Sequence, residues 1–212
     1  MFDQLSMFDT LPPGPPAPPL PTAPSPSSDG RADVPHALFF AGIADAADAA
    51  GLHQHAGVID RQFGIGGRLL EPERLHVSLF AIGAYLDGRP EADIARWCRA
   101  AAALRCASTE IVFDRFASFG GEGNPLVFKG SSDVEVAGLF ALYQALGMAL
   151  ADTGERIKRQ RITPHMTMSY RGKRIAETAI EPVRWRLHEL VLIDSHVGAH
   201  RHEIIGRWPL QA

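Results

Sequence analysis

Short apolar runs alternate with longer amphipathic segments along most of this 212-residue chain. Apolar runs bounded by turn residues predict strands at about residues 35–41, 109–119, 125–129, 185–195 and 201–208, and around residues 76 and 165. Segments with a period near 3.6 predict helices at about residues 45–62, 91–106 and 133–152. A strand, a helix and a histidine-bearing strand follow one another twice. This order predicts an α+β protein with two similar halves, related by a pseudo-twofold axis, that bring the two histidine strands together across a central cleft.

The N-terminal segment differs in composition from the rest. Residues 11–28 are mostly Pro, with Ala and Ser, and carry too few apolar side chains to form a core. We therefore expect residues 1–33 to be a disordered tail and residues 34–212 to form one two-lobed domain. A Pro-rich segment can also dock to a partner, but a solvated extension is the simpler interpretation.

Composition excludes several classes of protein. The chain is 46% hydrophobic and 21% charged, which is ordinary for a globular protein, and no apolar run approaches the roughly 20 residues that span a membrane. The N-terminus lacks a basic region followed by an apolar one, so we expect a cytoplasmic protein. We also expect a monomer. Cys98 and Cys106 match no zinc or redox spacing. A net charge of −3 gives no overall attraction to nucleic acid.

Two short segments share one pattern of histidine, any residue, hydroxyl residue and apolar residue. They are His76–Leu79 and His165–Met168. Because side chains alternate along a strand, each histidine points the same way as its hydroxyl partner, and the apolar residues point to the opposite face. Two such strands facing each other would surround one small volume with two imidazoles and two hydroxyl donors. That set of groups can break a phosphodiester without a metal. The alternative is that both histidines are partly buried strand residues, hydrogen-bonded to backbone.

The two segments resemble the two motifs of the two-histidine (2H) phosphoesterases, and most closely the RNA 2′,3′-cyclic phosphodiesterase branch, also called the 2′-5′ RNA ligase family. Residues 35–41, 116–119, 125–128, 185–195 and 208–210 also resemble strands of that family, so the resemblance covers about residues 34–210. It implies a bilobal fold in which each lobe is an antiparallel sheet backed by helices. It also implies that RNA with a 2′,3′-cyclic phosphate end is hydrolysed to a 2′-phosphate, with 2′-5′ ligation as the reverse chemistry.

The same resemblance assigns roles to the motif residues. His76 is expected to be the proton donor and His165 the proton acceptor, although the nearly equivalent motifs do not orient the pair. Ser78 and Thr167 are expected to bind the non-bridging phosphate oxygens. No metal or cofactor is expected. Two alternatives stay open: a phosphodiesterase of small cyclic nucleotides or nucleotide-sugar cyclic phosphates, and a non-catalytic RNA-binding module on the same scaffold.

Other residues are weaker candidates for substrate binding. Phe80 falls on the same strand face as His76 and could lie beneath a ribose or base, although a core position is the better interpretation. Arg161 and Arg171 flank the second motif and could bind phosphate, within a basic stretch that could equally be a solvated loop. Three histidines near the C-terminus suggest a metal site, but no cysteine accompanies them, and turn or edge-strand positions fit better. They are His196, His200 and His202.

Overall fold

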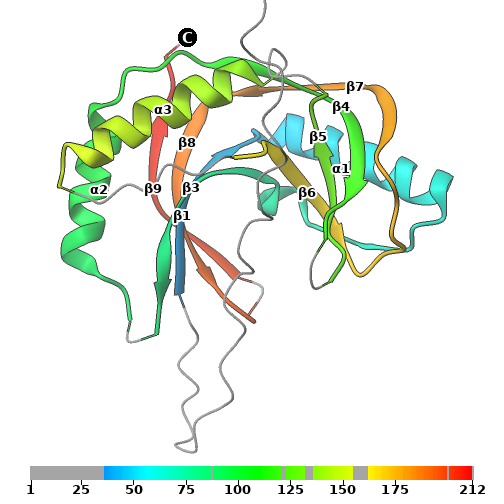
Figure 1. Cartoon of the computed structure of the whole chain (residues 1–212), viewed down its shortest axis with the longest axis horizontal. Coiled ribbons are helices and arrows are strands. Elements are labelled where there is room, and N and C mark those ends of the chain that lie inside the picture. Colours follow the sequence, from blue (N-terminus) through cyan, green and yellow to red (C-terminus); the bar gives the residue numbers. More distant parts are fainter. Residues whose placement is uncertain are drawn as a thin grey trace, which may run out of the picture.

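In the computed structural model, the described residues form a nine-stranded sheet with three α-helices (Figure 1). The structure describes residues 36–86, 88–120, 123–131, 136–154, 162–199 and 201–211. The predicted tail, residues 1–33, lies outside these ranges. The strands are β1 (His36–Ile43), β2 (Arg68–Leu69), β3 (His76–Tyr85), β4 (Thr109–Ser118), β5 (Leu126–Lys129), β6 (His165–Tyr170), β7 (Thr178–Leu187), β8 (Glu189–His196) and β9 (Arg201–Pro209). The helices are α1 (Ala46–Phe63), α2 (Glu91–Ala103) and α3 (Ala137–Ala151), with a short 3-10 turn, η1 (Pro72–Arg74).

The sheet consists of two antiparallel halves that meet at a narrow junction. The strand order is β7-β4-β5-β6-β3-β1-β8-β9, with β2 added to β6. Each half is held by extended ladders, whereas β3 and β6 pair at a single position, Val77 opposite Met166. The two histidine strands are therefore the two strands that face each other where the halves meet. The α+β, two-lobed architecture expected from the sequence is confirmed.

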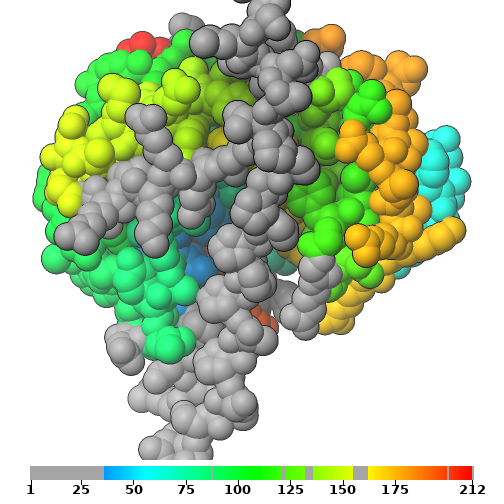
Figure 2. Space-filling view, viewed as in Figure 1, coloured from blue at the N-terminus to red at the C-terminus, as the bar shows by residue number. Residues whose placement is uncertain are grey.

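Two of the helices pack on the half of the sheet to which the preceding strand does not belong. Helix α1 follows β1 in the chain but packs beside β2 and β7 of the other half, while α3 follows β5 and packs on β3 and α2. In Figure 1, α2 and α3 lie on the side of β8 and β9, and α1 lies beyond β5 and β6. Figure 2 shows the same division at the surface, with α2 and α3 to one side and β4, β5 and β7 to the other. The chain therefore crosses repeatedly between the two halves.

Local sequence explains why the helices begin and end where they do. Asp45 caps α1, its side chain accepting a hydrogen bond from the Asp48 backbone N–H at 2.8 Å, and Gly64 ends the helix in the left-handed region that glycine adopts most readily. In α3, four leucines spaced at one or two turns are buried, so one face of the helix packs into the core. These are Leu139, Leu142, Leu146 and Leu150.

Two elements differ from the sequence-based prediction. The expected strand over residues 185–195 is in fact the end of β7 and most of β8, separated at His188, where the chain passes from one half-sheet to the other. The first part of β7 was missed because Pro182 and charged residues interrupt its apolar pattern. Proline is tolerated there since β7 is an edge strand. Within the described residues, no helix combines the length and apolar character needed to cross a membrane.

Candidate active site

The register of β3 and β6 gathers the four motif residues on one face of the sheet. Val77 and Met166 pair directly and are fully buried, so their neighbours along each strand point to the other side, toward the cleft. In an antiparallel pair the residue before Val77 lies opposite the residue after Met166. His76 therefore neighbours Thr167, and Ser78 neighbours His165. The two histidines form a diagonal pair, whose separation in such a ladder is roughly 7–8 Å.

Both imidazoles are held by the same local hydrogen bond. His76 Nδ1 lies 2.8 Å from the carbonyl oxygen of Arg74, and His165 Nδ1 lies 2.7 Å from that of Thr163. A carbonyl oxygen only accepts, so Nδ1 carries the proton in each ring. Nε2 is left as the exchangeable nitrogen, and among the described residues neither Nε2 has a hydrogen-bond partner. Each ring is thus poised to accept a proton when neutral or to donate one when charged.

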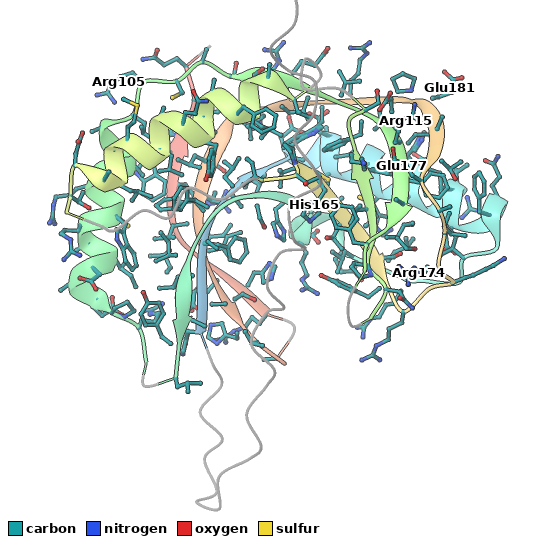
Figure 3. The ribbon with its side chains drawn as sticks, in the orientation of Figure 1. Arg105, Arg115, His165, Arg174, Glu177 and Glu181 are labelled. Carbon is teal, nitrogen blue, oxygen red and sulfur yellow. The ribbon has the colours of Figure 1, made fainter. Side chains whose placement is uncertain are left out.

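The surroundings of the two histidines are also similar. Phe39 of β1 lies against His76 with ring centroids 5.4 Å apart, and Phe119, just after β4, lies 4.7 Å from His165. The hydroxyls of Ser78 and Thr167 make no hydrogen bond with the described part of the chain, so they are available to a ligand. Figure 3 shows His165 near the middle of the molecule, between the two halves. The site consequently has the pseudo-symmetry that the repeated motif predicts.

Burial lowers the pKa of both histidines from the usual 6.5, although the hydrogen bonds to Arg74 and Thr163 act in the opposite direction. For His76 the positive charges of His165 and Arg74 lower the pKa further. The free protein therefore holds a proton on His76 less readily than an ordinary histidine does.

These shifts predict an acidic pH optimum. If one ring acts as base and the other as acid, activity falls at low pH when the base is protonated, and at high pH when the acid loses its proton. Because both pKa values are lowered, both limbs of the bell move to lower pH. We expect kcat/KM for a 2′,3′-cyclic phosphate to peak below about pH 6.5. A profile measured from acid to alkaline pH checks this, and an optimum above about pH 7 would contradict it.

The suggested substrate contact of Phe80 is wrong. A bulge in the pairing of β1 with β3 places Ala41 opposite Ser78 and Phe40 opposite Phe80, which leaves Leu79 as an extra residue. The alternation of faces is therefore interrupted before Phe80. Its ring is buried and stacks on Tyr143 of α3 with centroids 5.3 Å apart, so it belongs to the core rather than to the cleft.

The two arginine candidates are not brought to the site by the described structure. Arg161 lies outside the described residues. Arg171 follows the last residue of β6 and is exposed, with a positive φ of 63° and its backbone N–H bonded to the Gly123 carbonyl at 2.6 Å. It makes no recorded contact with His165 or Thr167, and its role in phosphate binding stays a prediction.

Sequence reasoning did not predict that His202 would lie beside His76. The His202 ring, from β9, lies 5.3 Å from the His76 ring, and a pocket of about 270 Å³ opens between them. The polar side chains that line it are Glu73, Arg74, His76, Arg201 and His202. Burial, followed by the charges of His76 and Arg74, lowers the pKa of His202 to about 4, so this ring is neutral at physiological pH. Only the curvature of the sheet brings β9 to β3, and no local pattern could have indicated it.

A second cluster contains residues that could bind a metal ion. His36, Asp194 and His196 place one possible ligand atom each within 4.8 Å of one another. Alternation along β1 puts this cluster on the core side, away from the motif histidines. Arg89 already lies 3.8 Å from Asp194 Oδ2 and 2.9 Å from Glu203, and thus supplies positive charge there. We interpret the cluster as an ion network that joins β1, β8, β9 and the start of α2.

Comparison with known proteins identifies the family. The model of the 2′-5′ RNA ligase superfamily matches residues 53–199, more than half of the chain, and includes both motifs. The chain belongs to the 2′-5′ RNA ligase superfamily. The resemblance to the 2H phosphoesterases is therefore confirmed, and membership supports a phosphoesterase activity. A comparison with curated protein sequences gives no match.

Solved structures share the fold of this superfamily member. E. coli LigT in apo form aligns with a TM-score of 0.63 at 19% identity, covering 84% of this chain and 99% of LigT. LigT complexed with 3′-AMP gives 0.63 at 18%, with the same coverage. TT0787 of Thermus thermophilus gives 0.62 at 17%, covering 83% and 98% of the two chains. At such low identity these similarities show the fold alone.

Proposed function

We propose that this superfamily member hydrolyses 2′,3′-cyclic phosphate ends of RNA to 2′-phosphates, using His76 and His165 as acid and base without a metal. The observation that carries the proposal is the matched state of the two rings. Each is fixed through Nδ1 to the carbonyl two residues before it, and each keeps a free Nε2 on the cleft face. Two proton-transfer groups and two free hydroxyls supply what the reaction needs.

The proposed reaction is an in-line displacement at phosphorus. Nε2 of one neutral histidine takes a proton from water, whose oxygen forms a new bond to phosphorus. The bond from phosphorus to the ribose 3′ oxygen breaks, and the other histidine, protonated at Nε2, gives its proton to that oxygen. Ser78 and Thr167 donate hydrogen bonds to the non-bridging oxygens as their charge increases in the transition state. The product is a 2′-phosphate with a free 3′ hydroxyl. The same displacement with a 5′ hydroxyl in place of water as the nucleophile would give a 2′-5′ linkage.

The assignment of His76 as donor follows from the family resemblance. In the free protein, Arg74 and His165 disfavour a proton on His76. A bound phosphate would offset these positive charges, so binding of the substrate and protonation of His76 are coupled in this proposal. The 3′-AMP in a LigT complex supports a nucleotide bearing a phosphate on its ribose as the type of ligand.

The test is to identify the terminal group formed. A short oligonucleotide ending in a 2′,3′-cyclic phosphate is incubated with the purified protein in the presence of EDTA, and the end group is assigned by ³¹P NMR. We expect a 2′-monophosphate, formed at the same rate without EDTA. Formation of a 3′-phosphate would contradict the mechanism, and binding of the oligonucleotide without turnover would favour a non-catalytic RNA-binding module.

A further inference from the structure

The pocket beside His76 lies on the side of that ring away from His165. Along the cleft face the order of strands β6, β3, β1, β8 and β9 carries the site from His165 through His76 to His202. A phosphate held between the two motif histidines would therefore have this pocket as its neighbour. His76 lines both this pocket and the proposed reaction site, whereas His165, Ser78 and Thr167 do not line the pocket.

One arginine side chain in the pocket lacks an acidic partner. Arg74 makes no ion pair with a carboxylate in the described ranges, and its Nε is buried with no hydrogen-bond partner there. Arg201 pairs with His196 across β8 and β9, and its guanidinium lies 3.0 Å from His196 Nε2, in the ion network on the opposite face of the sheet. Glu73, which also lines the pocket, is exposed. An unpaired buried arginine nitrogen favours an anion as its partner.

The floor of the pocket is apolar. Ile43, Ile193 and Ile204 line it and belong to a small hydrophobic cluster on the cleft face of the sheet, together with Phe39. His202 closes one side as a neutral ring, which adds a hydrogen-bonding group without adding charge. An apolar surface edged by a cation suits a nucleoside that carries a phosphate.

We propose that this pocket binds the terminal nucleoside and its 5′ phosphate, with Arg74 contacting that second phosphate. The inference rests on the proposed function and makes it more specific. It selects RNA ends, in which the terminal nucleotide always carries a 5′ phosphate, over nucleoside 2′,3′-cyclic phosphates that lack one. It thereby distinguishes an RNA-end phosphodiesterase from one that acts on small cyclic nucleotides.

The experiment compares two substrates that differ by one phosphate: uridine 2′,3′-cyclic phosphate and the same compound with a 5′ phosphate. We expect the 5′ phosphate to raise kcat/KM by about 10- to 100-fold, as charge-assisted hydrogen bonds would. In R74Q this ratio should fall to about 3 or less. R207Q is the matched control, because Arg207 lies on β9 and pairs with Glu189 at 2.6 Å, and it should keep the wild-type ratio.

The outcomes separate the two proposals. A wild-type ratio within about twofold, or an unchanged ratio in R74Q, would overturn the pocket assignment while leaving the phosphodiesterase intact. If neither compound is hydrolysed, the proposed function fails, and the pocket assignment is then tested by binding alone. In that case tighter binding of uridine 5′-monophosphate than of uridine, lost in R74Q, would support it, whereas equal binding would overturn it.

Discussion

Replacing His76 or His165 with alanine is expected to lower kcat/KM for a 2′,3′-cyclic phosphate by about 10²- to 10⁴-fold, the usual contribution of a general acid or base. Each ring supplies one of the two proton transfers, and no other described imidazole has a free Nε2 beside both a hydroxyl and the partner ring. Because both transfers belong to one displacement, the double variant should lose little more than either single variant.

His188 provides a matched control for this experiment. Its Nδ1 lies 3.2 Å from the carbonyl oxygen of Arg186, so it has the same bond to the carbonyl two residues earlier, but it lies at the corner between β7 and β8. The H188A variant should retain wild-type activity. Circular dichroism and thermal melts of all variants separate loss of chemistry from loss of fold. Full activity in both H76A and H165A would refute the acid–base assignment.

Replacing Asp194 with alanine is expected to lower the free energy of unfolding by about 2–4 kcal/mol. The carboxylate is fully buried, and Oδ2 lies 2.7 Å from His36 Nδ1 and 3.8 Å from Arg89 Nη1. Removing it leaves buried polar partners unsatisfied and loosens the contact between β1, β8 and the start of α2. Urea unfolding followed by tryptophan fluorescence measures the change.

An exposed ion pair serves as the comparison for D194A. Glu110 and Arg184 pair at 2.7 Å on neighbouring strands, both largely exposed. E110A should change the free energy of unfolding by less than about 1 kcal/mol, because solvent screens the pair. If D194A and E110A had equal effects, the buried network would not contribute to stability as described.

The sequence indicated the motif face of the site because that face depends only on local alternation. His76, Ser78, His165 and Thr167 share the cleft face for the same reason that Val77 and Met166 are buried. The carbonyl bonds to the two rings are equally local, since each spans two residues. Features that depend only on residues within one strand were therefore predictable from the sequence.

The remaining features depend on contacts between distant segments. The bulge at Leu79 directs Phe80 into the core, and it arises from the pairing with β1 rather than from the β3 sequence. His202 reaches His76 only because β9 curves toward β3 across two intervening strands. Each of α1 and α3 packs on the half of the sheet opposite to that of its preceding strand, and this too leaves no periodic signal in the chain. Pairing, curvature and crossover are tertiary properties, which a pattern of apolar residues does not encode.

The central claim is that both imidazoles contact one phosphate, and ring-nitrogen NMR tests it most directly. Protein labelled with ¹⁵N in its histidines is titrated with a nucleoside 2′-monophosphate, the proposed product. We predict that the Nε2 resonances of His76 and His165 shift together with a single Kd at one ligand per chain, while both Nδ1 stay protonated and His188 does not move. A response of only one motif ring, or two responses with different Kd values, would contradict the account.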